Sequence, residues 1–428
     1  MIKPKRIAAG AIFGLLYLAA EGGSAIVLTK LFTALSGRST AGTYTLIAYV
    51  LALSNMLVTS LGTVISRSIA LRLDSVPDLS VERWAVPRVV RVSLSILAAS
   101  YLVAFIVAFW FRPGQALTHE DVAAWCIFCA GHLIRLYALH YAYVALGHGD
   151  IGADRRQQFF VAAIFFACSV AVLESGGSLL SVAILYAVVS TVALGAAAIR
   201  QHNKFPAPQW EGKLDRTTQR NVFKAMALGS IAILFNNIAG FFIMNGDVFV
   251  VQFLFGHQLV AEYSLYSRLA ALLVAVGSLV PLMYFPAIAA AWGKGDLEQC
   301  RHYRRNGLQL GLAVAAAGGI ASLIAYPPVV DWVFPGSRTL PFQILPLILV
   351  YAALSIHTVA NGMPVIATGR HNFVQLSAVN AIANLMAAGI LGKLFGPIGI
   401  PVGFIAASLI PSFLYRRISL KTFCAGAA

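Results

Sequence analysis

The sequence predicts an all-α polytopic membrane protein with about 12 transmembrane helices in two six-helix bundles. First, the 428 residues are 59% hydrophobic and only 11% charged, whereas soluble domains average about 25% charged residues. Second, the apolar residues gather in runs of about 20, the length that crosses a bilayer as a helix. Third, the positive charges alternate between successive loops. These observations exclude the soluble, disordered and disulfide-scaffold classes.

Twelve apolar runs are long enough to span a membrane, although two of them are short. Residues 175–178 and Gly396-Pro397 are tight turns, which predict two helical hairpins. The N-terminal run continues past Glu21 to about Phe32, which is too long for a signal peptide and predicts an uncleaved first helix. The predicted spans are 7–32, 41–66, 89–111, 122–147, 159–175, 179–199, 225–246, 261–290, 306–326, 342–366, 374–394 and 398–415.

The positive charges predict the orientation of these spans. Of the 31 Lys and Arg residues, 24 fall in one set of alternate loops and five in the other. The positive-inside rule therefore places both termini in the cytoplasm. The same placement explains the net charge of +15 without nucleic-acid binding, which the sequence does not favour.

The chain divides naturally at its longest predicted cytoplasmic linker, residues 200–224, which contains Pro206 and Pro208. We therefore expect an N-terminal bundle over 1–212 and a C-terminal bundle over 213–428. Six spans in each half would give a parallel repeat, as in many secondary transporters. The starts of the second and eighth spans are weakly similar, a likeness that two unrelated apolar spans can also show.

Ionisable residues inside spans are costly, so each is a candidate functional residue. Glu21 lies midway along the first span and shares a helix face with Tyr17 and Ser24. Either it faces a cavity, where it could couple transport to an ion, or it is a structurally paired or protonated carboxyl.

The fourth span contains Arg135 with His132 and His140. A guanidinium in a polar cavity suits a phosphate, because it offers a planar fork of donors. The alternative is an arginine paired with Glu21 or Asp247 to hold helices together.

Metal binding is not favoured. Cys126, Cys129 and His132 are spaced three residues apart on the fourth span, but a zinc site needs a fourth ligand. We interpret these residues as packing, and we expect no metal, cofactor or disulfide framework.

The seventh and eighth spans contain a further charged group. Asp247 lies near one end of the seventh, and Glu262 and Arg268 follow in the eighth. Asp247 and Glu262 are candidates for proton or cation coupling. A structural Asp247–Arg268 pair is the alternative.

The last spans carry polar stripes. The tenth holds His357 and Asn361, with Pro346 and Pro364 expected to break its helix, and the eleventh holds Asn380 and Asn384. Such stripes serve either as interhelical hydrogen-bond contacts or as a sugar-binding wall.

Motifs for enzymes are absent from the sequence. There is no Gly-x4-Gly-Lys-Ser/Thr for nucleotide hydrolysis and no Gly-x-Ser-x-Gly or His-Glu-x-x-His. The expected protein is not an enzyme, and it would use an ion gradient or transport its substrate downhill.

Several segments resemble the polysaccharide and O-antigen flippases of the multidrug/oligosaccharidyl-lipid/polysaccharide superfamily. The C-terminal hairpin at Phe395-Gly-Pro-Ile-Gly is similar to their eleventh-to-twelfth-helix pattern, and Gly42-Thr43-Tyr44 resembles part of their first hairpin. Further matching residues are Asp247-Val-Phe-Val-Val, Gly256, Val260-Ala-Glu-Tyr-Ser, Arg268-Leu, Pro286 and Gly295-Asp296.

This resemblance implies a MATE-like fold, with two bundles around a cationic cavity. It implies alternating-access transport of an isoprenoid-pyrophosphate-linked oligosaccharide across the bacterial inner membrane, alongside a polysaccharide polymerase and export machinery. It further implies that cavity arginines hold the pyrophosphate, with Arg135 first and Arg268 second. The chain has fewer arginines inside its spans than the family typically shows, so His132 and His140 would assist.

Two rival functions stay open. One is a Na⁺- or H⁺-driven exporter of drugs or small molecules from the same superfamily, which predicts a more acidic cavity. The other is a membrane-embedded glycan polymerase or acyltransferase, which needs an essential acid or His on an outer face. Few acids lie in the predicted outer loops: Glu120, Asp121 and Asp331.

Overall fold

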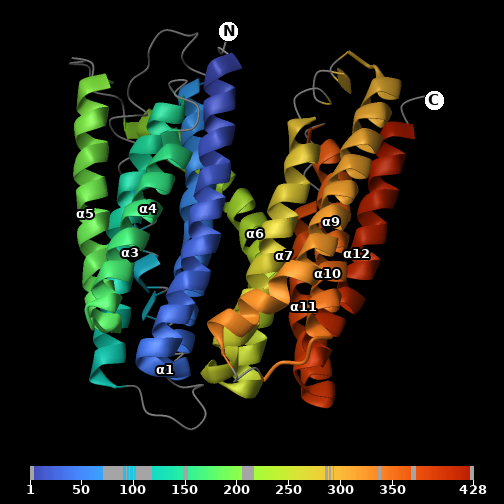
Figure 1. Cartoon of the computed structure of the whole chain (residues 1–428). Coiled ribbons are helices and arrows are strands. Elements are labelled where there is room, and N and C mark those ends of the chain that lie inside the picture. Colours follow the sequence, from blue (N-terminus) through green and yellow to red (C-terminus); the bar gives the residue numbers. More distant parts are fainter. Residues whose placement is uncertain are drawn as a thin grey trace. The chain divides into compact units, whose positions relative to one another are not determined.

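The computed structural model describes most of the chain (Figure 1). The described residues are 4–70, 90–102 except 93, 96 and 100, 118–147, 153–204, 216–284, 288, 291–335 except 293, 339–367 and 373–424. These residues are almost entirely helical. The all-α expectation is therefore confirmed.

The described helices follow the predicted spans closely. In the N-terminal part they are α1 (Pro4–Ala70), α3 (His119–Gly147), α4 (Ala153–Glu174) and α5 (Leu179–Lys204). In the C-terminal part they are α6 (Arg216–Phe255), α7 (His257–Met283), α9 (Leu297–Val333), α10 (Ile344–Ala367), α11 (Phe373–Phe395), the short 3₁₀ helix η2 (Gly396–Ile398) and α12 (Gly399–Cys424).

Within the described ranges, nine segments are long and apolar enough to cross a membrane. Two of them, Ile12–Gly62 and Gln375–Phe423, each cover most of two predicted spans. More than half of the predicted third span lies outside the described residues. The described part of it contains a short apolar helix, Val90–Ala99.

The first two predicted spans form a hairpin inside α1. Gly37 has φ 86° and ψ 166°, a left-handed conformation that glycine adopts readily. The rings of Phe32 and Tyr44 lie 4.8 Å apart, although 12 residues of straight helix would separate them by about 18 Å. The halves of α1 therefore lie side by side (Figure 1, dark and lighter blue).

Two other turns agree with the sequence. The 175–178 turn is closed by hydrogen bonds from Gly176 N to Leu173 O and from Gly177 N to Val172 O, and Gly176 has φ 86°. Between α11 and α12, Gly396 has φ 69°. The expected break in the tenth span is wrong: α10 runs unbroken from Ile344 to Ala367. Pro346 lies in its first turn, where no helical hydrogen bond is lost.

The chain divides into two compact units, residues 1–238 (unit 1) and 239–428 (unit 2), and α6 belongs to both. In unit 1, α3 packs against α5 and α1, and α1 packs against α4. In unit 2, α10 packs against α7, α9 and α12, and α11 packs against α12. Exposed apolar residues form stripes on outer helices, as a bilayer-facing surface requires. On α5 the stripe consists of Ile184, Val188, Val192 and Ile199.

Candidate functional site

The polar centre of unit 1 is built on α3, close to the middle of the helix. Arg135 donates from Nη1 to the phenol oxygen of Tyr186 on α5, at 3.3 Å. His132, one turn earlier, places Nδ1 2.7 Å from the same oxygen. His132 and Tyr186 are 1% and 4% exposed. We name Arg135, His132 and Tyr186 the arginine cluster.

Aromatic rings surround the arginine cluster. The Tyr186 ring lies 6.2 Å from that of His132 and stacks on it, and it meets Phe165 edge-on at 5.1 Å. Tyr101 lies edge-on to His132 at 6.4 Å, and its hydroxyl bonds with Ser54 of α1. Four helices, α1, α3, α4 and α5, together with Tyr101 thus supply one ring-lined polar region.

Glu21 belongs to the electrostatic environment of Arg135. The groups that act on the Arg135 charge include Glu21 and Tyr17, both on α1. Glu21 is exposed, whereas Tyr17 is buried. The hydrogen bond that the structure shows for Arg135 goes to the neutral Tyr186. The structure therefore places Glu21 near the arginine cluster, with its carboxylate open to the surroundings.

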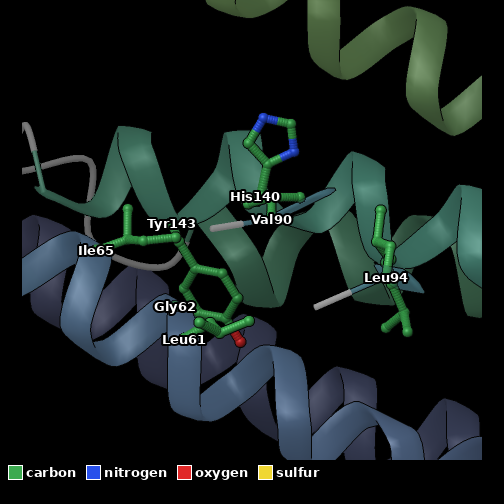
Figure 2. Close-up of a pocket in the computed structure, with 8 residues that line it drawn as sticks. Leu61, Gly62, Ile65, Val90, Leu94, His140 and Tyr143 are labelled. Atoms are coloured by element: carbon green, nitrogen blue, oxygen red, sulfur yellow. The ribbon is translucent and has the colours of Figure 1, made fainter. Parts of the chain in front are cut away.

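His140 lies apart from the arginine cluster, although the sequence groups it with Arg135. Its Nδ1 is hydrogen-bonded to the backbone oxygen of Tyr137. It lines a small apolar pocket together with Tyr143 and Gly62. The Tyr143 ring points toward Gly62 of α1, whereas the His140 ring points away from α1 (Figure 2). A Cβ on Gly62 would lie 2.3 Å from the Tyr143 ring. This region holds α1 and α3 together.

In unit 2, Asp247 of α6 is a buried carboxylate held by neutral groups. Its Oδ1 accepts from the Ser267 hydroxyl of α7 at 3.0 Å and from the Val248 N–H at 2.9 Å. The side chain of Tyr263 also interacts with it. Arg268 follows Ser267 on α7 and is half-buried. The structure thus brings Asp247 and the Arg268 segment of α7 into one region.

Glu262 has a clear structural explanation. Its two carboxylate oxygens accept from the Thr339 N–H at 3.3 and 3.1 Å, from the Thr339 hydroxyl at 2.6 Å and from the Leu340 N–H at 2.9 Å. Glu262 is only 1% exposed. A carboxylate bonded in this way anchors the segment before α10, so we do not carry it forward as a coupling residue.

Asn380 and Asn384 are buried on α11, which packs against α12. Asn384 accepts from the Ser408 hydroxyl of α12 at 3.1 Å. On the same stripe, Ser377 bonds with Tyr415 of α12 at 2.7 Å. Of the two readings left open for this stripe, the contacts of Asn384 and Ser377 favour hydrogen bonding between helices.

Among the described residues, no three His, Cys, Asp or Glu side chains lie close enough to hold a metal ion. Cys126 is exposed whereas Cys129 is buried, so the two thiols point to different surroundings. Sequence reasoning did not identify Tyr186, although tyrosine recurs in the apolar spans. It also counted Arg304 as a loop residue, whereas the structure places it inside α9.

No protein-family model matches the sequence, and no curated protein matches it. Solved structures do match. The inward-facing conformation of a multidrug resistance MATE family transporter of the MOP superfamily has a TM-score of 0.75 and 15% identity, with 97% of this chain and 95% of that chain covered.

Two further structures agree. The MATE multidrug transporter DinF-BH in complex with R6G has a TM-score of 0.69 and 14% identity, with 98% of this chain and 95% of that chain covered. The lipid II flippase MurJ in an inward closed conformation has a TM-score of 0.70 and 12% identity, with 97% and 90% covered. The expectation of a MATE-like fold is confirmed: this chain has the fold of the MOP-superfamily transporters.

Proposed function

We propose that this protein flips an isoprenoid-pyrophosphate-linked oligosaccharide across the bacterial inner membrane by alternating access, with both termini in the cytoplasm. The observation that carries the proposal is the arginine cluster. Its guanidinium lies midway along a membrane-length helix and bonds to a neutral phenol. A guanidinium so placed can bind a phosphate through its remaining N–H groups.

The chemistry of this cluster supports the proposed substrate class. The protein need make no bond in the substrate, because alternating access only requires different affinities in two states. The Tyr186 hydroxyl holds Arg135 and His132 in a fixed orientation toward a phosphate anion. The likeness to a lipid II flippase supports a lipid-linked cargo.

Within this proposal, Arg135 and His132 contact the pyrophosphate, and Arg268 is a separate candidate for anion binding in unit 2. Asp247 and Glu21 are the coupling candidates, through H⁺ or Na⁺. Asp247 supports this role because the hydrogen-bond donors that the structure describes for it, Ser267 and the Val248 N–H, are neutral, so a proton or cation could bind its carboxylate. The flipped glycan would then be the substrate of a polysaccharide polymerase.

A drug or small-molecule exporter is the second candidate, and the likeness to MATE multidrug transporters supports it equally. The two candidates differ in the charge of the cargo. A cationic drug would be repelled by Arg135 and attracted by the exposed Glu21. The cargo of a lipid-linked glycan flippase carries the opposite charge. Substitutions that remove the charge of Arg135 or Glu21 should therefore change drug transport and glycan transport in opposite directions.

The test is deletion of the gene in its host, followed by extraction of membrane lipids. We expect isoprenoid-pyrophosphate glycan to accumulate on the cytoplasmic side and surface polysaccharide to be lost. Wild-type protein should reverse both changes, and Arg135→Ala should not. Failure of Arg135→Lys as well would indicate a bidentate contact, because lysine keeps the charge without the fork.

Arg305→Ala is the matched control, because Arg305 is an exposed arginine of α9 and should complement fully. All variants must reach the membrane at wild-type levels. Normal surface polysaccharide with no accumulated lipid, in a host with no second flippase, would contradict the proposal. If the deletion strain instead becomes sensitive to cationic dyes, the exporter reading replaces it.

A further inference from the structure

A second polar network, separate from the arginine cluster, lies in unit 2 on α9, α10 and α12. Arg304 of α9 donates from Nη1 to Oδ1 of Asn361 on α10, at 2.9 Å. Asn361 is fully buried, and its Nδ2 donates to the backbone oxygen of His357 at 2.8 Å. The amide orientation is therefore defined, and it presents its oxygen to Arg304.

The network continues to α12. Nδ1 of His357 lies 2.7 Å from the hydroxyl of Ser412, which is 4% exposed. Nε2 of His357 lies 3.3 Å from Asn361 Nδ2, which can only donate. In this arrangement Nε2 accepts, and the imidazole is neutral when its Nδ1–H donates to Ser412.

A second guanidinium, that of Arg416, lies close enough to act on this network electrostatically. Arg416 follows Ser412 by four residues, which places both on one face of α12. The charged groups that act on His357 are those of Arg416 and Arg304. Arg304 is half-buried and Arg416 is exposed. The network is thus a region of positive potential with one fixed and one adaptable guanidinium.

We propose that Arg304 and Arg416 bind a phosphate-class anion at this α9–α10–α12 site. Asn361 and His357 act as positioning residues, because they hold Arg304 in place through the buried amide. A phosphate or pyrophosphate matches two guanidinium forks with parallel N–H donors. This site goes beyond the proposed function, since it lies on other helices and does not require a glycan as cargo.

The ordinary explanation for such arginines is that they extend to lipid head groups at the membrane surface. That explanation treats all exposed basic residues alike. The chain offers a direct contrast, because Arg305 and Arg417 are exposed and each follows one residue after a site arginine. An adjacent helical residue points about 100° away, so only Arg304 and Arg416 should contribute to a built site.

The experiment measures anion affinity of the full-length protein in nanodiscs of neutral lipid, by calorimetry with inorganic pyrophosphate and with a short-chain isoprenyl diphosphate. Arg304→Gln and Arg416→Gln should each weaken binding about 10-fold, equivalent to about 1.4 kcal/mol. Arg305→Gln and Arg417→Gln should change it less than about 2-fold. Arg304→Lys, which keeps the charge, should bind with intermediate affinity.

A double-mutant cycle tests the positioning residue. Asn361→Ala should weaken binding in the background that retains Arg304. It should have little further effect in Arg304→Gln, because both changes abolish the positioning of the Arg304 guanidinium by Asn361. A merely structural role for Asn361 would give additive losses. Thermal unfolding of each variant confirms that the folded protein is being measured.

The source of the anion is separated by a third arm, in which nanodiscs contain anionic phospholipid. If that lipid competes with pyrophosphate at the wild-type site, a bilayer head group can occupy it; without competition, the anion is free or isoprenoid-borne. Equal losses in the Arg304 and Arg305 variants, or no loss in Arg304→Gln, would overturn the proposal. All titrations are made in an Arg135→Gln background, because the arginine cluster is itself proposed to bind pyrophosphate. The binding that remains there reports the α9–α10–α12 site alone, whether or not the glycan proposal holds.

Discussion

The polar interiors of the two units are built in opposite ways. In unit 1, a guanidinium on α3 is held by one neutral phenol and ringed by aromatic side chains. In unit 2, Glu262 receives four hydrogen bonds from one loop. Both groups are charged, so their charge does not distinguish the two roles. A group with one partner can exchange that partner for a ligand, whereas a group with several rigid partners stabilises the structure. Arg135 belongs to the first kind and Glu262 to the second.

The largest expected effect is that of Glu262→Ala. It leaves the Thr339 and Leu340 N–H groups unpaired and removes the link between α7 and the segment before α10. We expect a loss of roughly 3–5 kcal/mol in the free energy of unfolding, measured by denaturation in detergent. Glu262→Gln should retain part of the stability, because one oxygen still accepts.

Glu298→Ala is the control for that change, since Glu298 is an exposed acid in the first turn of α9. It should alter stability by less than about 0.5 kcal/mol. If Glu262→Ala folds as stably as Glu298→Ala but stops transport, Glu262 is a functional residue after all and the contrast between the units fails.

The second effect concerns the packing of α12 on α11. A Cβ on Gly403 would lie 2.5 Å from the backbone nitrogen of Ala388, so the two helices must separate. Gly403→Ala should destabilise the protein by about 1–3 kcal/mol, measured as above. Gly389→Ala is matched, because nothing lies within 4 Å of its added Cβ, and it should not destabilise.

Gly62→Ala sharpens the comparison between units. Its added Cβ would meet the Tyr143 ring, a side chain that can shift, whereas Gly403 faces backbone. We therefore expect a smaller loss in unit 1 than in unit 2. Equal losses would show that the Tyr143 ring is held as rigidly as the α11 backbone.

The helices were largely predictable from the sequence, whereas the contacts that separate these roles were not. Apolar runs located the spans because a bilayer demands continuous hydrophobic length. Tyr186 lies 51 residues from Arg135, and Thr339 lies 77 from Glu262. Such partners depend on which helix faces pack together. The sequence alone consequently does not separate a coupling role from a structural role for Glu262, and it predicts a loop at Arg304, which lies inside α9.

The substitution Tyr186→Phe should separate stability from transport. It removes the hydroxyl shared by Arg135 and His132 but keeps the ring. We expect about 1 kcal/mol of lost stability and a marked loss of glycan transport in the complementation assay. Tyr415→Phe in unit 2 removes a hydroxyl bonded to Ser377 at 2.7 Å and should cost similar stability with transport intact. Transport by Tyr186→Phe at wild-type rates would contradict a substrate-binding arginine cluster.

The smallest effect is expected for Ser408→Ala, which removes the hydrogen bond from α12 to Asn384. Interhelical hydrogen bonds in membranes average about 0.6 kcal/mol, so the unfolding midpoint should move only slightly. Ser419→Ala on the same helix is the control, because the Ser419 hydroxyl is buried with no partner among the described residues, and its loss should be neutral or stabilising. If the α11 stripe only joins helices, both variants will transport normally. A selective loss of transport in Ser408→Ala would instead restore the sugar-binding reading of Asn384, and it would show that polar groups in unit 2 can serve the substrate as those of unit 1 are proposed to do.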